Sequence, residues 1–269
     1  MCGRYVTVSK LTVIEKRFNV VAPQPTGYQI RANIGPGSKT PVITNETPGE
    51  LQFFTFGFTP FWAKKPMYVF NARAEGDHNK EDDPHFHGTK GIISKPMFRQ
   101  SIRSKRCLVP ADAYLEGPKK ERLSKPHVVY RSDGQRPFAF AGIWDQWVNK
   151  DTGEEVSSFA IITTAAYGVL NKIGHHRAPL ILRPEDESAW LSNDLPLGDV
   201  TSLLIPGDPK SLNAYPIDPA IKNPRAEGLD LLRPTGERLI PEYEYRFETD
   251  LKLEGMGHTQ ARQRRLDFE

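Results

Sequence analysis

The sequence predicts an α+β fold: a single domain built on a mostly antiparallel β-sheet or partly closed barrel, with short flanking helices. Most apolar segments are short and separated by turn residues, which is typical of strands joined by tight connections. Few segments show apolar side chains at helical spacing, and no internal repeat or long linker divides the chain. We therefore expect one domain over residues 1–232 and a charged C-terminal extension over residues 233–269.

The predicted elements follow in chain order. Residues 3–6 form a first strand, and Leu11, Ile14 and Phe18 then share one face of a short helix. A looping path is expected over residues 21–36, where proline and glycine are frequent. Ser132 to Gly134 is a hairpin turn signal between two strands. Further strands are expected over residues 51–58, 68–70, 127–131, 138–144, 159–164 and 180–182, and helices from Pro184 and over residues 199–205.

Composition bounds the class of protein. The 269 residues are 26% charged and 38% hydrophobic, and no apolar run is long enough to span a bilayer. Charged residues interrupt the only apolar stretch near the N-terminus, so we expect no signal peptide. The two cysteines, Cys2 and Cys107, argue against a disulfide scaffold and indicate a reducing compartment. The net charge of +3 permits a basic groove for an anionic polymer.

Two stretches look like additions to the predicted domain. Residues 76–89 are polar and contain His78, His85 and His87, a pattern that fits a solvated loop better than a metal site with too few ligands. The C-terminal extension ends with Arg262, Arg264 and Arg265. That cluster could meet nucleic acid or an acidic partner, or belong to a disordered or surface-docked tail.

The start of the chain, Met1-Cys2-Gly3-Arg4, is its most informative segment. Removal of the initiator methionine, expected before a small residue, would leave a cysteine with a free α-amine and a thiol on neighbouring carbons. Ordinary pKa values of roughly 7.7–8.0 for the amine and about 8.5 for the thiol keep both usable near neutral pH. Such a 1,2-aminothiol condenses with an aldehyde to an imine and then closes a thiazolidine ring. Position alone also fits a merely tolerated second residue.

A cysteine nucleophile needs groups that hold and relay protons, and three later segments offer them. Residues 71–75 follow an apolar strand, residues 106–116 end an apolar run with an acid, and residues 175–179 precede a buried strand. Ordinary explanations stay open for each. Asn71 could cap a turn, Glu116 could pair with Lys119 or Lys120, and His175 could be solvated.

In combination and in this order, the segments closely resemble one family. They are Cys-Gly-Arg at the start, Asn-Ala-Arg-Ala-Glu at residues 71–75, Arg-Cys-Leu-Val-Pro-Ala-Asp from residue 106, and His-x-Arg-x-Pro at residues 175–179. The family is SRAP, the SOS-response-associated peptidases or abasic-site-processing proteins. Weaker similarities lie at residues 33–37, 57–62, 141–144 and 215–217. The resemblance runs from Cys2 to about Leu232.

The resemblance implies a reaction. In that family the N-terminal cysteine captures the ring-opened aldehyde of an abasic site in single-stranded DNA as a stable thiazolidine crosslink. It implies that Cys2 supplies both nucleophiles and that Asn71 orients its backbone and amine. Glu116 would be the general acid–base, and His175 would move a proton to or from the deoxyribose oxygen. Supporting residues are Gly3 and Thr164; neither a metal nor an organic cofactor is implied. A weak lyase activity and self-processing of Met1 are implied as well.

DNA must also be held, by phosphate contacts and by stacking on aromatic or apolar side chains. Arg73 could alternatively pair with Glu75, and Trp62 could alternatively belong to the core. One departure from the family is at the acid, where Leu115 and Gly117 flank Glu116 without the usual tryptophan. A second is Ala178, which replaces a larger residue. The residues expected to contact DNA are Arg4, Arg73, Pro36, Trp62, Lys95 and Arg99.

The resemblance therefore predicts a monomer that acts on single-stranded DNA containing abasic sites, in the cytoplasm at the bacterial nucleoid or in a eukaryotic nucleus. Replication-fork proteins are expected partners and a membrane is not. Two rival functions stay open. One is an N-terminal-nucleophile thiol peptidase or amidohydrolase that uses Cys2, Asn71 and Glu116. The other is a noncatalytic binder of single-stranded DNA.

Overall fold

A computed structural model describes residues 3–23 and 27–242 of the chain. Cys2 and the basic cluster of Arg262, Arg264 and Arg265 lie outside the described residues. The chain divides into two compact units, Met1–Glu237 and Arg238–Glu269. All helices and strands given below belong to the first unit.

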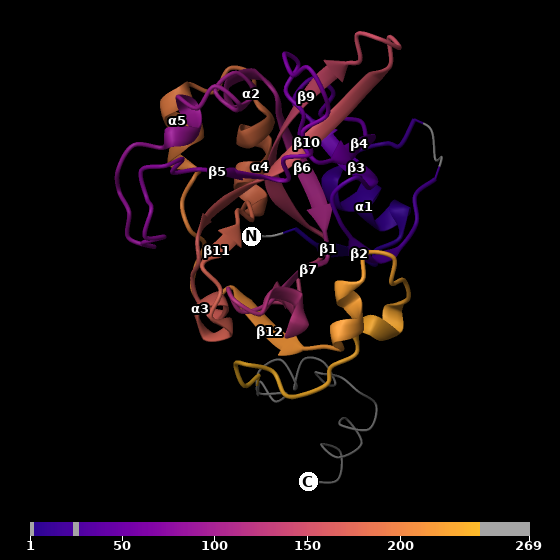
Figure 1. Cartoon of the computed structure of the whole chain (residues 1–269), viewed down its shortest axis with the longest axis vertical. Coiled ribbons are helices and arrows are strands. Elements are labelled where there is room, and N and C mark those ends of the chain that lie inside the picture. Colours follow the sequence, from indigo (N-terminus) through magenta and orange to yellow (C-terminus); the bar gives the residue numbers. More distant parts are fainter. Residues whose placement is uncertain (1–2, 24–26, 243–269) are drawn as a thin grey trace, which may run out of the picture. The chain divides into compact units, whose positions relative to one another are not determined.

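The strands of the first unit form two sheets (Figure 1). The five-stranded sheet has the order β12-β8-β7-β1-β2, and the other has the order β11-β10-β4-β3-β6-β9, with β5 added beside β10. The bounds are β1 Tyr5–Thr7, β2 Arg31–Ile34, β3 Lys39–Thr44, β4 Gln52–Phe56, β5 Asn71–Arg73, β6 Arg106–Ala111, β7 Ala113–Glu116, β8 His127–Arg131, β9 Phe138–Val148, β10 Glu155–Ala165, β11 Arg177–Pro179 and β12 Leu212–Pro216.

The second sheet closes on itself. β9 pairs with β10 as well as with β6, so β10, β4, β3, β6 and β9 form a ring of five strands. Most pairings are antiparallel; β10 pairs in parallel with β4 and with β5. The predicted α+β fold with a mostly antiparallel, partly closed barrel is therefore confirmed.

Short helices flank the sheets. α4 contacts β6 and β9, and the buried Arg106 fastens it there by donating to the carbonyl oxygens of Trp190 and Ser192. Among the described residues, no helix has the length and apolar character that crossing a bilayer requires. The α-helices are α1 Leu11–Phe18, α2 Ser101–Ser104, α3 Val169–Ile173, α4 Pro184–Leu191 and α5 Leu197–Ser202, and 3-10 turns lie at Gly91–Ile93, Arg122–Ser124, Pro219–Lys222 and Leu229–Leu232.

Aromatic side chains join the two sheets. The Tyr5 ring on β1 meets Phe56 of β4 edge-on at 5.5 Å and Phe140 of β9 at 6.0 Å. Tyr114 on β7 meets the same Phe140 ring at 5.9 Å. Edge-to-face packing of this kind adds to the stabilisation from burying the rings. It fixes β1 and β7 against the barrel, and the candidate site lies where β1 begins and β7 ends.

Several predicted elements differ from the observed ones. The strand expected over residues 68–70 is instead β5, because Tyr68 adopts a left-handed φ of 53° that interrupts an extended run. The strand expected over residues 180–182 is observed as β11 at residues 177–179. The predicted hairpin at Ser132 to Gly134 is wrong: β8 belongs to the five-stranded sheet and β9 to the barrel. The helix expected over residues 199–205 is α5.

Candidate active site

A cavity of about 580 Å³ opens where β1 begins and β7 ends. Among the described residues, five that the sequence singled out line it, although they come from four separate segments of the chain: Gly3, Arg4, Pro36, Glu116 and His175. Its other lining residues are Phe70, Leu115, Gly117, Lys119, Arg122, Leu123, His176 and Lys222.

Glu116 is the last residue of β7 and is only 4% exposed. Side chains alternate along a strand, so Glu116 shares a face with Tyr114, which packs against the barrel. Leu115 points the other way, into the apolar cluster of the five-stranded sheet. Within the described part of the chain, Oε1 of Glu116 has no hydrogen-bond partner. Burial in this position raises the pKa of Glu116 to about 7.

His175 completes a pair with Glu116. Gly174 takes a left-handed conformation (φ 79°) that ends α3 and turns the chain, so that the next residue enters the cavity. His175 Nδ1 lies 2.7 Å from the carbonyl oxygen of Gly117, and Nε2 lies 3.2 Å from Glu116 Oε2. Lys119 and Lys120 are exposed and Glu116 is buried, so His175 and not a surface lysine is the observed partner.

The hydrogen-bond geometry and the burial of this pair together indicate which atoms carry its protons. A carbonyl oxygen only accepts, so Nδ1 carries the imidazole proton and donates it to Gly117. Burial lowers the pKa of His175 to about 3, which keeps the ring neutral with Nε2 as an acceptor. The protonated carboxyl of Glu116 is then the donor to Nε2. The pair can release or take up a proton near neutral pH, as a general acid–base must.

Gly117 explains why the cavity lacks a large side chain after the acid. A Cβ atom at this position would lie 1.8 Å from the carbonyl oxygen of Arg122 and 2.8 Å from that of Lys125. The β7–β8 connection thus fills the space, with Arg122 itself held at a left-handed φ of 52°. The Lys119 amide donates to the carbonyl oxygen of Gly174 and ties this connection to the segment that carries His175.

The connection also brings in cations that sequence reasoning missed. Lys119 and Arg122 line the cavity, and so does the distant Lys222, whose Nζ lies 3.0 Å from Ser124 Oγ. The basic run over residues 119–125 was a signal for the first two. Nothing in the local sequence pointed to Lys222, because the 3-10 turn at Pro219–Lys222 reaches the cavity through tertiary packing.

Arg4 lines the cavity, and its side chain lies beside Gly35. Its Nη1 donates to Asn33 Oδ1 at 2.6 Å, and the Asn33 amide in turn donates to three carbonyl oxygens of residues 221–226. Partial burial lowers the pKa of Arg4, which stays a cation at any physiological pH. The exposed Pro36 lies just after β2 on the same lining.

Asn71 and Thr164 are not among the lining residues of the cavity. Asn71 begins β5, next to the lining residue Phe70, and pairs with Ile161 of β10. Its Nδ2 donates to the carbonyl oxygen of Phe70. Thr164 is 1% exposed on β10.

The other expected DNA contacts lie away from the cavity. Arg73 Nη2 is 2.8 Å from Asp82 Oδ1, so its ion pair is with Asp82 and not with Glu75. Lys95 pairs with Asp77 at 2.7 Å, and Arg99 is exposed. Trp62 is 50% exposed and is therefore not a core residue.

Metal ligation finds no support at these positions. Among the described residues, no group of three or more His, Cys, Asp or Glu side chains is arranged to hold a metal ion. His78, His85 and His87 belong to the irregular stretch between β5 and the 3-10 turn at Gly91–Ile93.

Comparison with known proteins gives the family. The family model of the SOS response associated peptidases (SRAP) matches residues 1–224, so the chain belongs to the SRAP family. It is 30% identical over 238 residues to the abasic site processing protein YoqW of Bacillus subtilis, covering 86% of this chain and 99% of that protein. It is 27% identical over 244 residues to the abasic site processing protein YedK of Escherichia coli, covering 87% and 100%. A crystal structure of a Bacteroides thetaiotaomicron protein superposes with a TM-score of 0.72 at 28% identity, covering 87% of this chain and 100% of that one.

Proposed function

We propose that the protein processes abasic sites in DNA, and that it captures their ring-opened aldehyde in single-stranded DNA through Cys2. The observation that carries the proposal is the buried Glu116–His175 pair, which faces a cavity also lined by Gly3. Gly3 directly follows Cys2 in the sequence, which supports Cys2 as the nucleophile that acts in this cavity. The abasic site processing relatives, similar over most of the chain, support the same substrate.

The reaction has two bond-forming steps. After Met1 is removed, the α-amine of Cys2 adds to the aldehyde carbon, and loss of water gives an imine. The thiolate then adds to the imine carbon, the nitrogen takes up a proton, and a thiazolidine ring closes. The imine alone could instead undergo β-elimination, which gives a weak lyase activity when thiolate attack is slow.

Glu116 is the group suited to move protons in both steps. In its protonated form it donates to the carbinolamine hydroxyl that leaves as water, and its carboxylate then accepts a proton from the thiol. A pKa near 7 serves both directions at neutral pH. His175, held neutral, accepts from Glu116 and can pass a proton to or from the sugar oxygen. Asn71 would orient Cys2 from β5, with Gly3 and Thr164 in support.

Cations around the cavity would hold the DNA strand. Arg4, Lys119, Arg122 and Lys222 line it, and Glu116 is the one acid among the described lining residues and is neutral when protonated. The described lining is therefore net positive, as phosphate contacts require. This distribution of charge supports Arg4 as a phosphate contact, and it adds Lys119, Arg122 and Lys222 as further candidates. We place this activity on single-stranded DNA near replication forks, in the cytoplasm or a nucleus, with the protein acting as a monomer.

A denaturing gel with an abasic oligonucleotide tests the proposal. Protein from which Met1 has been removed should give a heat-stable shifted band, and Cys2→Ala should give none. A wild-type protein without a covalent product would overturn the proposal. Binding without crosslinking would favour the noncatalytic single-strand binder, and turnover of peptides or amides that depends on Cys2 would favour the hydrolase.

A further inference from the structure

The polar 76–89 loop that interrupts the domain between β5 and the 3-10 turn at Gly91–Ile93 places an acid between two arginines. Its ends meet closely, since a Cβ atom on Gly76 would lie 2.8 Å from the Cα atom of Gly91. Within the described chain, buried hydrophobic side chains stop at Ala74 and resume at Ile92. The loop is therefore attached to the domain by polar contacts.

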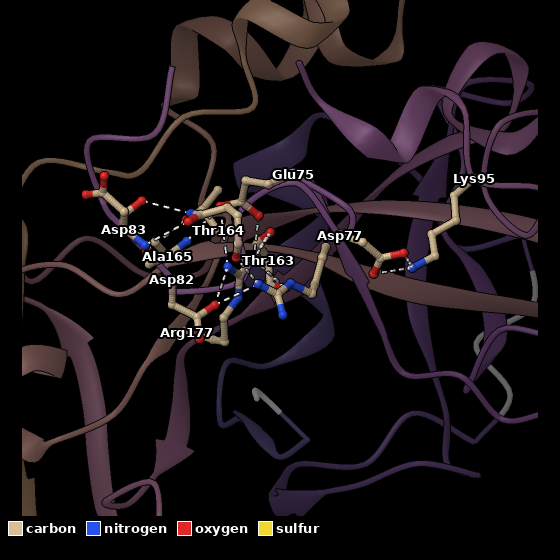
Figure 2. Close-up of polar contacts among 11 residues, drawn as sticks. Glu75, Asp77, Asp82, Asp83, Lys95, Thr163, Thr164, Ala165 and Arg177 are labelled. Atoms are coloured by element: carbon tan, nitrogen blue, oxygen red, sulfur yellow. Dashed lines mark hydrogen bonds and ion pairs between the residues drawn. The ribbon is translucent and has the colours of Figure 1, made fainter. Parts of the chain in front are cut away.

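Asp82 makes the central contact. Its Oδ1 is 2.8 Å from Nη2 of Arg73 on β5. The same atom is 3.1 Å from Nη1 of Arg177 on β11, and Figure 2 labels both Asp82 and Arg177. These two strands both pair with β10, so two guanidinium groups from different strands converge on one carboxylate oxygen. Arg177 is otherwise held by Glu75 Oε2 at 2.7 Å and by the carbonyl oxygen of Thr163.

The charges of this cluster balance only while Asp82 is in place. Burial alone would raise the pKa of Glu75, but the hydrogen bond and charge of Arg177 lower it, so Glu75 is anionic. Glu75 and Asp82 then match Arg73 and Arg177. Without Asp82 the cluster keeps one uncompensated positive charge. Guanidinium groups recognise carboxylates and phosphates with the same planar fork of donors, so a phosphate fits the vacated position.

We propose that Asp82 is an intramolecular substitute for a DNA phosphate. It occupies the anion site between Arg73 and Arg177, and a strand phosphate binds there when the 76–89 loop carries Asp82 away. The inference rests on the proposed function in so far as the anion is a phosphate of single-stranded DNA. The other polar attachments of the loop include the exposed Asp77–Lys95 pair and the contacts of Asn79, so opening disrupts no apolar core.

Asp82→Asn tests the inference, with Asp83→Asn as the matched control. Both substitutions remove one negative charge from the same loop, but the Asp83 carboxylate accepts from the exposed His85 amide and contacts neither arginine. Binding of an undamaged fluorescent single-stranded oligonucleotide is measured by anisotropy over a salt series. Asp82→Asn should bind at least about fivefold more tightly than Asp83→Asn, the lower end of typical coupling between sites. Its logarithmic salt slope should steepen by about 0.7 for each additional phosphate that the variant binds.

A double variant separates competition from loosening of the loop. Adding Arg73→Gln to Asp82→Asn should abolish the increase in affinity. Equal affinities of the two single variants would overturn the inference, and so would an increase that persists in the double variant. A lowered Tm of Asp82→Asn without tighter binding would show that Asp82 only anchors the loop. Crosslinking of wild-type protein to an abasic oligonucleotide is assayed in parallel; its absence refutes the proposed function and leaves the affinity comparison intact.

Discussion

At the scale of single residues, burial shifts Glu116 and His175 in opposite directions and makes them complementary. Loss of hydration raises the pKa of the carboxyl group to about 7, and the same cause lowers the pKa of the imidazole and keeps it neutral. Each is then the natural hydrogen-bond partner of the other. A charged pair in the same place would have to offset the larger penalty of removing two ions from water.

Replacing the acid tests its role in the reaction. Glu116→Gln keeps the size and the ability to donate to His175 Nε2 but cannot exchange a proton, so crosslinking should slow by about 10²-fold or more. The measurement is the rate of adduct formation with an abasic oligonucleotide, alongside affinity for an undamaged one. Affinity should be unchanged, and the exposed Glu121→Gln variant should crosslink at the wild-type rate. Wild-type rates in Glu116→Gln would remove this residue from the mechanism.

The pH dependence of the free energy of unfolding should also reveal the raised pKa of Glu116. In the unfolded chain Glu116 has its ordinary pKa of 4.5, whereas in the folded chain its pKa is about 7. The wild-type protein therefore loses stability as the pH rises through this range. Glu116→Gln does not titrate. Between about pH 4 and about pH 8 the free energy of unfolding of the variant should rise by about 2–3 kcal/mol relative to wild type, since one pKa unit corresponds to about 1.4 kcal/mol. The lowered pKa of His175 also reduces stability as the pH falls below 6.5, the ordinary pKa of histidine. Because both proteins contain His175, this effect cancels in the difference between them.

Denaturant unfolding at the two pH values measures this difference. If the difference in free energy of unfolding between the two proteins is the same at both pH values, Glu116 is ionised in the folded state at neutral pH. The proton assignment of the Glu116–His175 pair would then be wrong.

The residues of this pair could be selected from the sequence, but their contact could not. Glu116 and His175 are 59 positions apart, and the contact between the β7–β8 connection and Gly174, the residue after α3, helps to bring them to 3.2 Å. The positions of Lys222 and Asp82 could not be predicted from the sequence for the same reason. Both are ordinary charged residues in polar segments, and their positions depend on tertiary contacts.

At the scale of elements, the β7–β8 connection shapes the cavity and depends on one glycine. Gly117→Ala would drive a Cβ atom into backbone carbonyl oxygens that no side-chain rotation can move. We expect it to destabilise the protein by about 3 kcal/mol, the upper range for overpacking, and to weaken DNA binding through displaced Lys119 and Arg122.

A second glycine supplies the control for that prediction. Gly198 lies in α5, and a Cβ atom added to it would meet open space. Gly198→Ala should stabilise the protein by about 0.5–1 kcal/mol through higher helix propensity. Thermal and denaturant unfolding measure both variants. Equal stability of Gly117→Ala and wild type would show that the connection is not held against β7 as described.

The elements themselves were predicted unevenly. β8 was expected at its observed bounds and β9 at its observed start, because their apolar and β-branched runs are bounded by clear turn residues. Their assignment to one hairpin failed, because β8 pairs instead with β7 and β12. Local turn chemistry indicates that the chain reverses, and it does not say which strand becomes the neighbour.

At the scale of the whole molecule, the family resemblance and the α+β class were predictable from the order of the motifs. The sequence predicted a partly closed barrel, but it did not predict that the barrel closes by pairing of β9 with β10. The boundary expected at residue 232 stays a prediction. The amide of Thr235 donates to the carbonyl oxygen of Pro216 on β12, so the first unit makes contacts slightly beyond that boundary.

Truncation after Glu237 tests the division of the chain. The shortened protein should unfold cooperatively with a Tm within about 2 °C of the full-length protein, a change that corresponds to about 0.5–1 kcal/mol. It should also form the crosslink. A large loss of Tm would mean that residues 238–269 contribute to the folding of the first unit.

The central claim is that Cys2 forms a covalent bond to an abasic site with loss of one water. Intact mass spectrometry of the reaction with an abasic oligonucleotide measures this directly. We predict a one-to-one adduct whose mass is that of the protein without Met1 plus the oligonucleotide, less one water, that survives heating and is absent with Cys2→Ala. A spectrum that contains only the two unreacted components, or a stable adduct that persists in Cys2→Ala, would contradict it.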